Sequence, residues 1–305
     1  MNDMRNLKRA IAAVVALFIL GSIQANAESV GTPTTTWFPT EKTQLAYQTF
    51  GSVGTTYVLL AGGPGMNPAY VAPIAARLAS GGRRVVLFHQ RGTGLSAPAI
   101  VDRSRMNLAG AVADVDALRV HLGKSKLNLI GHSWGGMLAM AYATRYPDRV
   151  GSLVLIDTGP MDAGQFSRAG AAMQAALKPT ERTAIAVALR KGDRKQAREI
   201  YDGASFADRS NVPLLKASVG NAPLEYPNVS DLIGSSIAHI DARPGVRAMR
   251  APVFLIFGIA DPGYFIAAQI RALDPRAQLV TIQHAGHYCW LENPTASFKA
   301  IDALP

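Results

Sequence analysis

The chain has 305 residues, of which 49% are hydrophobic and 17% charged, and this composition is ordinary for a soluble globular protein with a sizeable core. Its formal net charge is +10, but no Lys/Arg-rich stretch is interleaved with aromatic residues as in a nucleic-acid groove. We therefore interpret the charge as a general surface property and expect no nucleic-acid partner. The single cysteine, Cys289, excludes an intramolecular disulfide.

The first residues have the pattern of a secretory signal peptide. Three basic residues precede an apolar stretch at 10–23, and the small-x-small site Ala25-Asn26-Ala27 follows. An uncleaved membrane anchor is the alternative, but the apolar stretch is short for a span that needs about 20 residues. We predict cleavage after Ala27, export to the periplasm or medium, no stable membrane span after cleavage, and a mature chain with net charge +8.

Beyond the signal segment, short apolar runs typical of buried strands alternate with amphipathic or alanine-rich stretches typical of helices. The first expected strands lie at 43–50, 56–60, 84–88, 127–130 and 153–156. The first expected helices lie at 68–80, at 108–122 and directly after 133. Apolar strands that alternate with helices predict a mostly parallel sheet covered by helices on both faces.

The alternation stops between about Gly159 and Met249, where the sequence is alanine-rich and strand-poor, and this predicts an inserted helical cap. The sheet pattern resumes at 253–258 and 278–282, with a helix between them and a last helix at about 294–304. The expected division is a signal peptide at 1–27, a core at 28–158 and 250–305, and a cap at 159–249. We interpret the densest basic cluster of the cap as a solvated helix face: Arg190, Lys191, Arg194, Lys195 and Arg198.

The motif Gly-His-Ser-Trp-Gly at 131–135 joins an apolar run to helical sequence, which is the strand, sharp turn and helix of a nucleophile elbow. Ser133 is therefore the candidate nucleophile, and a glycine-rich turn with a capping serine is the alternative. Glycine is needed at 131 and 135, because a Cβ there would crowd the neighbouring strand or helix.

A serine hydroxyl needs a base within hydrogen-bond reach and an acid that orients the base. Catalytic groups of a parallel sheet gather at the carboxyl ends of its strands, and Asp261 and His287 each follow such an end. The chain order Ser133, Asp261, His287 is that expected of an α/β-hydrolase. Asp157 could orient the histidine instead, and His284 could be the base, although we expect it to point into the sheet.

Acyl transfer also needs hydrogen-bond donors aimed at the developing oxyanion. The backbone N–H of Trp134, just after the nucleophile, is one candidate. Gly63, in the Gly-Gly-Pro-Gly loop at 62–65, is the second, because a loop without side chains lets the substrate approach.

Two other kinds of site are disfavoured. His284 and His287 have a spacing that metal ligands can use, but no third histidine or His-Glu-x-x-His helix supports a metal site. The segment 92–97 fits the dinucleotide pattern Gly-x-Gly-x-x-Ala, but no helix opens directly on its glycines. We expect neither a metal nor a cofactor.

Taken together, these motifs resemble the proline iminopeptidase (prolyl aminopeptidase) group of serine peptidases among the capped α/β-hydrolases. The matching segments are 62–65, 90–96, 131–136, 146–150, Asp261, 286–287 and 290–294. The resemblance implies an α/β-hydrolase fold, a triad of Ser133, Asp261 and His287, no cofactor, and a cap that shapes the pocket for a small molecule or a short peptide.

The sequence departs from this family at two strand ends. The family usually has histidine before Gly-Gly-Pro-Gly and aspartate before Gln-Arg-Gly, whereas this chain has Ala61 and His89. Because the two strand ends are expected to be adjacent, our hypothesis is that His89 occupies the space of the missing histidine.

The substrate class stays open between an aminopeptidase and a carboxylesterase acting on small esters. Family aminopeptidases hold the amino terminus of the substrate with cap carboxylates, and Glu225 is a candidate for that role. The cap, however, has a net charge of +3 over residues 160–248. A non-catalytic ligand-binding protein on the same scaffold is the third possibility.

Overall fold

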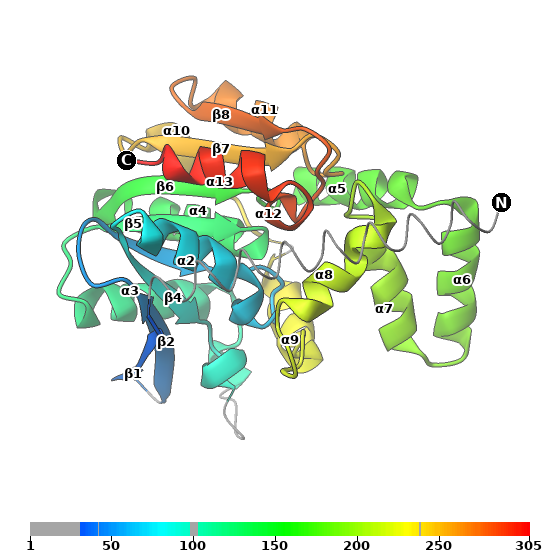
Figure 1. The fold of residues 1–305 in the computed structure, drawn as a ribbon, viewed down its shortest axis with the longest axis horizontal. Helices are drawn as coiled ribbons and strands as arrows, with labels where there is room; N and C mark the ends of the chain where they lie inside the picture. Colours follow the sequence, from blue (N-terminus) through cyan, green and yellow to red (C-terminus); the bar gives the residue numbers. More distant parts are fainter. Residues whose placement is uncertain (1–30, 42, 98–102, 238) are drawn as a thin grey trace.

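The computed structural model describes residues 31–41, 43–97, 103–237 and 239–305, so the predicted signal peptide lies outside the described residues. The described chain is built around one eight-stranded sheet (Figure 1). Its strands are β1 (Thr34–Pro39), β2 (Gln44–Phe50), β3 (Thr56–Leu60), β4 (Arg84–His89), β5 (Leu127–His132), β6 (Val150–Ile156), β7 (Val253–Gly258) and β8 (Gln278–Ile282).

The strand order is β1-β2-β4-β3-β5-β6-β7-β8. β2 pairs antiparallel with β1 and with β4, and all later pairs are parallel. This mostly parallel sheet confirms the predicted α/β-hydrolase fold. Strand β1 was not predicted, because most of its side chains are exposed and it lacks the apolar run of a buried strand.

Helices cover both faces of the sheet, as predicted. Buried side chains of α3 (Leu108–His121), α4 (Trp134–Arg145), α10 (Arg243–Ala248) and α11 (Phe265–Leu273) join the core on one face. Buried side chains of α2 (Ala72–Ser80), α12 (Cys289–Glu292) and α13 (Pro294–Asp302) join the core on the other face. The central strands of the sheet are thus shielded from water, which fits their continuous apolar sequence.

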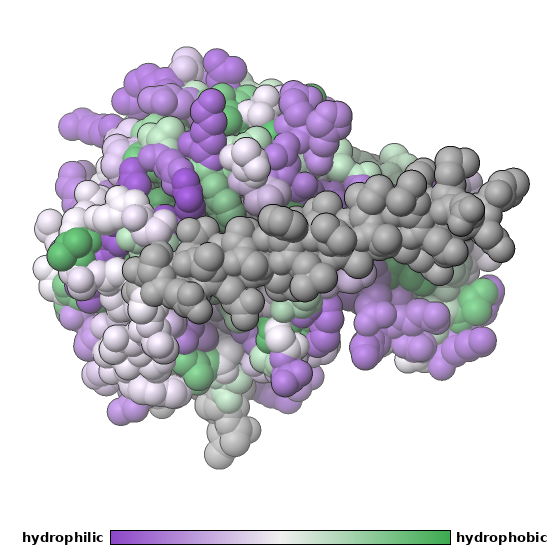
Figure 2. All heavy atoms as spheres, viewed as in Figure 1, coloured by the Kyte–Doolittle hydropathy of each residue, from purple (hydrophilic) through white to green (hydrophobic). Residues whose placement is uncertain are grey.

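The segment between β6 and α10 is helical, as expected for a cap. It contains α5 (Ala163–Ala176), α6 (Pro179–Arg190), α7 (Arg194–Gly203), α8 (Val212–Ala217) and α9 (Pro227–Ile237). In Figure 1 the pair α6 and α7 projects away from the sheet, and the face of this tip seen in Figure 2 is largely hydrophilic. Among the described residues, no helix is both long and apolar enough to cross a membrane.

Short 3-10 turns connect several of these elements: η1 (Pro68–Val71), η2 (Gly94–Ser96), η3 (Arg103–Arg105), η4 (Pro147–Arg149) and η5 (Arg209–Asn211). The glycines of the dinucleotide pattern lead into η2, a turn of three residues, and not into a helix. A Cβ on Gly92 would lie 2.7 Å from the side chain of Val229 in α9, so this loop is packed against the cap. The arrangement differs from a dinucleotide site, where a helix N-terminus faces the pyrophosphate.

Candidate active site

Ser133 is the single residue between β5 and α4, where the backbone turns sharply. Its φ of 54° lies in the left-handed region that residues with a Cβ rarely adopt. A Cβ on Gly131 would lie 2.4 Å from the Gly135 carbonyl oxygen, and one on Gly135 would lie 2.1 Å from that of Leu60. The turn is therefore possible only with glycine on both sides, as the sequence analysis argued.

Asp261 and His287 follow β7 and β8, and the structure brings their side chains into contact. His287 Nδ1 lies 2.8 Å from Asp261 Oδ2, so the ring donates its Nδ1 proton to the carboxylate. The other carboxylate oxygen accepts a 2.6 Å hydrogen bond from Gly263 N–H. With both oxygens occupied, the carboxylate fixes the orientation of the ring, and Nε2 is left as the nitrogen that can accept a proton.

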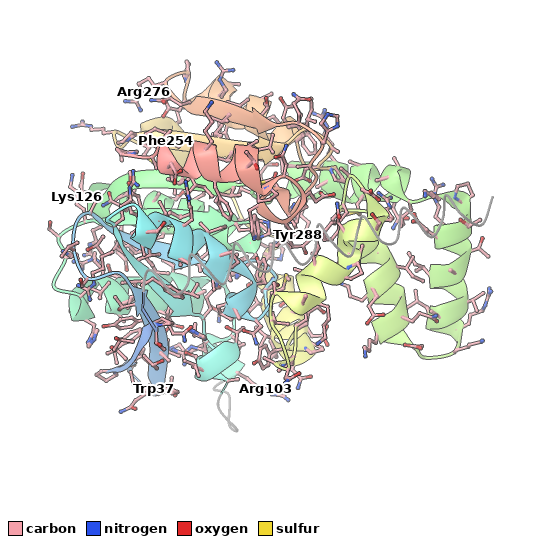
Figure 3. The ribbon with its side chains drawn as sticks, in the orientation of Figure 1. Trp37, Arg103, Lys126, Phe254, Arg276 and Tyr288 are labelled. Carbon is pink, nitrogen blue, oxygen red and sulfur yellow. The ribbon has the colours of Figure 1, made fainter. Side chains whose placement is uncertain are left out.

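His287 lies beside the elbow. The ring of His132, the residue before Ser133, is 4.8 Å from the ring of His287, centroid to centroid. Figure 3 shows the next residue, Tyr288, where the core meets the cap. The three residues Ser133, Asp261 and His287, which we name the candidate triad, thus come from three strand ends at one edge of the sheet.

Asp157, the alternative acid, is fully buried behind Asp261. Its Oδ1 accepts a 2.7 Å hydrogen bond from Gly258 N–H, whereas Asp261 is the carboxylate that contacts His287. Burial, followed by the charge of Asp261, raises the pKa of Asp157 well above its ordinary value. Asp157 therefore contacts the strand end rather than the imidazole.

His284, the alternative base, differs from our expectation. We expected it to point into the sheet, but the residue is exposed. The reason is local, because the chain leaves β8 at Ile282 and His284 adopts a left-handed turn with φ 55°. Among the described residues, no group of three or more His, Cys, Asp or Glu side chains is placed to hold a metal ion.

The candidate oxyanion donors lie at the start of α4 and in the loop after β3. Trp134 is the first residue of α4, where backbone N–H groups have no partner within the helix. In the loop, Gly62 N–H donates a 2.7 Å hydrogen bond to the Tyr70 hydroxyl, so the next amide, that of Gly63, is the candidate donor. A Cβ on Gly63 would lie 2.5 Å from Gly65 N, which explains the glycine there.

Gln90 is a structural residue that the sequence analysis did not single out. Its amide nitrogen donates to the Ala61 carbonyl at 2.8 Å, and its amide oxygen accepts from the indole N–H of Trp134 at 2.8 Å. The side chain thus ties the end of β3 to the start of α4. The Gln-Arg-Gly motif was the available signal, although it did not indicate which groups the glutamine joins.

His89 is buried, and both of its ring nitrogens have partners. Nδ1 accepts a 2.9 Å hydrogen bond from Leu95 N–H, and Nε2 donates to Gln48 Oε1 at 3.1 Å. Burial lowers the pKa of His89 to about 4, so the ring is neutral near pH 7. The two bonds hold the ring against β2 and η2, and its place in the space of the missing histidine stays a hypothesis.

Three charged residues of the cap, Arg198, Asp202 and Glu225, form what we name the cap cluster. Arg198 Nε lies 2.8 Å from Asp202 Oδ1, and Arg198 Nη2 lies 3.3 Å from Glu225 Oε1. Arg198 is therefore an ion-pair partner as well as part of the exposed helix face that we predicted, because its side chain is still 49% exposed. Periodicity marks the faces of α7 but does not tell which face meets another element.

The cap cluster adjoins both parts of the candidate site. Glu225 forms a β-bridge with Met66, and Asn67 N–H donates to the Leu224 carbonyl at 2.8 Å, so this segment pairs with the Gly-Gly-Pro-Gly loop. A positive charge on His287 would lower the pKa of Asp202, so the two side chains lie within electrostatic range of each other. Burial, as the leading cause, raises the pKa of Asp202 to about 6.

A second link joins the cap to the His287 loop. Glu292 Oε2 accepts hydrogen bonds from Gly286 N–H at 2.6 Å and from Ala207 N–H at 3.2 Å. His287 N–H itself donates to the Ser205 carbonyl at 2.8 Å. The backbone of the candidate base is thus anchored to the cap segment between α7 and η5.

The sequence and fold were compared with known proteins. The family model for the alpha/beta hydrolase fold matches residues 57–294. The chain is 37% identical to a proline iminopeptidase of Clostridium botulinum over 140 residues, which are 45% of this chain and 46% of that protein. It is 36% identical to one of Lactiplantibacillus plantarum over 141 residues, which are 46% of this chain and 48% of that protein.

The alignment therefore spans about half the length of these curated relatives. Among solved structures, a proline iminopeptidase-related protein of Thermus thermophilus superposes with a TM-score of 0.71 at 23% identity. The superposition covers 89% of this chain and 96% of that protein. The similarity to proline iminopeptidases that the motifs predicted is confirmed, and the structural match confirms the fold.

Proposed function

This chain belongs to the alpha/beta hydrolase fold family, and we propose that it is an exported serine hydrolase that releases N-terminal proline from short peptides. The observation that carries the peptidase assignment is the cap cluster, which places two carboxylates and one guanidinium next to the candidate triad and the oxyanion loop. Each part of the proposal is argued below.

The proposed reaction begins at Ser133. His287 Nε2 takes the hydroxyl proton while Ser133 Oγ attacks the carbonyl carbon of the substrate, and Asp261 stabilises the imidazolium that forms. The N–H groups of Gly63 and Trp134 stabilise the oxyanion, and each such donor contributes about 2.7–4 kcal/mol in comparable enzymes. The amine leaves with the proton from His287, and water then attacks the acyl-enzyme by the same route.

Charge supports a substrate with a free amino terminus. The cap has a net positive charge, but the cap cluster has two carboxylates against one guanidinium and is therefore locally negative. The side chains of Asp202 and Glu225 are only 15% and 25% exposed, so their surplus charge lies in a partly desolvated place. A primary ammonium group, or the secondary ammonium group of an N-terminal proline, balances one negative charge, whereas a neutral ester gains nothing from it.

The test is a side-by-side assay of the purified mature protein on prolyl and alanyl arylamides and on short p-nitrophenyl esters, with Ser133→Ala as the blank. We expect prolyl-arylamide turnover, with a KM that rises about tenfold or more in Asp202→Asn and Glu225→Gln while ester KM stays unchanged. Glu181→Gln is the matched control, because Glu181 also pairs with a cap arginine, Arg209, and the control should leave both KM values unchanged.

Two results would redirect the proposal. Ester turnover without arylamide turnover from about pH 6 to 9 would establish the carboxylesterase alternative. The half-exposed guanidinium of Arg198 would then be the group to examine for ester selectivity. No turnover and no reaction of Ser133 with a fluorophosphonate would establish a ligand-binding protein on the hydrolase scaffold.

Export rests on the signal-peptide pattern at 1–27. We expect the exported protein to begin at Glu28 and to be found in the periplasm or the medium. Intact-mass analysis of the exported protein measures this directly. A mass that includes the apolar stretch at 10–23 would instead establish an anchored form.

A further inference from the structure

A chain of three hydrogen bonds connects the oxyanion loop to the main chain of His287. Gly62 N–H lies 2.7 Å from Tyr70 Oη, Tyr70 Oη lies 2.5 Å from His132 Nδ1, and His132 Nε2 lies 2.8 Å from the His287 carbonyl oxygen. Tyr70 and His132 have no role in the proposed reaction, but they connect the oxyanion loop to the main chain of the candidate base, and both of these segments have one.

The hydrogen bonds and the burial of His132 together assign the protons of this network. The His287 carbonyl can only accept, so His132 Nε2 carries a hydrogen. Burial lowers the pKa of His132 well below its ordinary value, so at pH 7 the ring is neutral and Nδ1 is unprotonated. Nδ1 then accepts from the Tyr70 hydroxyl, whose oxygen in turn accepts from Gly62 N–H. A charged ring would reverse the bond to Tyr70, because Nδ1–H would then donate to the hydroxyl oxygen.

The side chains of this hydrogen-bonded network are buried and closely packed. Tyr70 and His132 are both fully buried, and the Trp290 ring stands edge-on to His132 with its centroid 4.7 Å away. A Cβ on Gly62 would lie 2.6 Å from Tyr70 Oη and 3.0 Å from His132 Nδ1. Because water has no access to the two side chains, each lost bond leaves a buried polar group unpaired.

We propose that Tyr70 and His132 are positioning residues that hold the oxyanion loop and the base at a fixed separation, so that the donor of Gly63 and the ring of His287 meet the same reacting carbonyl. The inference rests on the proposed function for the roles of Gly63 and His287. Asp261 fixes the ring of His287 and Ser205 holds its N–H, and His132 adds the carbonyl, which completes the restraint of that residue.

The kinetic test measures the rate at which a fluorophosphonate labels Ser133, because labelling needs both the base and the oxyanion donors. Tyr70→Phe removes one hydroxyl and should slow labelling about tenfold to a hundredfold, the range that small misplacements of reacting groups cost. His132→Leu should slow it at least as much. His132→Gln should fall between His132→Leu and the wild type, because its amide nitrogen can still donate to the His287 carbonyl.

Tyr142→Phe is the matched control. Tyr142 is also fully buried, and its hydroxyl donates to Asp116 Oδ1 at 3.0 Å, away from the candidate site. We expect both tyrosine variants to lower the thermal midpoint, and only Tyr70→Phe to slow labelling. Equal labelling rates in Tyr70→Phe and Tyr142→Phe would overturn the positioning role.

A second measurement is independent of activity. Nitrogen-15 spectra of labelled histidine should show His132 in the neutral Nε2–H form at pH 7, and this signal should shift in Tyr70→Phe but not in Tyr142→Phe. An Nδ1–H form or a charged ring would overturn the inference. If wild-type Ser133 is not labelled, the proposed function fails. The histidine spectrum then tests by itself whether Tyr70 and His132 are hydrogen-bonded as described.

Discussion

The candidate triad and the cap cluster are positioned in different ways. Ser133, Asp261 and His287 each follow a strand of one sheet. Backbone hydrogen bonds between the strands therefore set the positions of these three residues, whatever contacts their side chains make. Arg198 and Asp202 lie on α7 and Glu225 lies on the segment before α9, and ion pairs between their side chains hold them together. Under the proposed function, the topology of the core sets the catalytic geometry, whereas the side chains of the cap set the substrate preference.

The largest expected effect comes from a core carboxylate. Asp261→Asn should lower kcat about 10⁴-fold with the fold intact, because the amide can no longer hold His287 in the required tautomer. Asp157→Asn is the matched control and should retain turnover within about tenfold, since an amide oxygen can still accept from Gly258 N–H. Measured kcat values that reverse this order would make Asp157 the acid.

A second core residue should control stability rather than turnover. The pKa of His89 is about 4 in the folded protein, below the 6.5 of a free histidine, so the unfolded chain binds the extra proton between these values. Stability should therefore be complete above pH 6.5 and fall as the pH drops towards 4, by about 1.4 kcal/mol per pH unit and about 3 kcal/mol in total.

Urea unfolding at pH 7 and pH 4.5 measures this loss. His89→Gln should be less stable at pH 7, yet its stability should fall less than that of the wild type between the two pH values. His284→Gln, at an exposed position, is the control and should behave like the wild type. An equal fall in wild type and His89→Gln would show that His89 does not carry this pH dependence.

The cap cluster should give the substrate interaction its own pH dependence. The pKa of Asp202 is raised to about 6, so its carboxyl is charged above pH 6 and neutral below it. The cluster then loses its surplus negative charge, and KM for a prolyl arylamide should rise by up to about tenfold per pH unit below 6. The comparison is KM from pH 5 to 8 in the wild type and in Asp202→Asn, whose KM should be high and flat. A KM that still changes with pH in Asp202→Asn would show that Asp202 is not the source of the pH dependence.

The smallest expected effect is a change in stability when alanine replaces a cap glycine that has free space for a Cβ, a space that the core glycines of the elbow lack. Gly170 in α5 has no atom within 4 Å of a Cβ position, in contrast to Gly135 at the elbow. Gly170→Ala should stabilise the protein by about 0.5–1 kcal/mol, because alanine favours a helix. Gly220→Ala is the matched control, since Gly220 is equally open but has a φ of 58°, and it should destabilise. Urea midpoints of the two variants should move in opposite directions.

The same contrast explains what the sequence could predict. Apolar strands, their order and the residues after them identified the fold and put Ser133, Asp261 and His287 at one edge of one sheet. The elbow glycines were predictable too, because their steric requirement is local to the turn. Sequence motifs and strand order were sufficient for the candidate triad, since backbone hydrogen bonds between strands determine where its residues lie.

Side-chain directions were not predictable in this way. Arg198 is exposed, as its place in a basic run indicated, but its ion pairs with Asp202 and Glu225 could not be predicted, because helical periodicity does not reveal which face meets another element. Asp202 had no signal at all, and Glu225 was only a candidate until its pairing with Met66 placed it. His284 was misplaced for a related reason, since the direction of a side chain at a strand end depends on the following loop.

The central claim is that Ser133 is the nucleophile, activated by His287. The most direct measurement is reaction of the purified mature protein with a fluorophosphonate, followed by peptide mapping of the labelled residue. The account predicts one label, on Ser133, which is absent in Ser133→Ala and much slower in His287→Ala. A label on another residue, or unchanged labelling in His287→Ala, would contradict it.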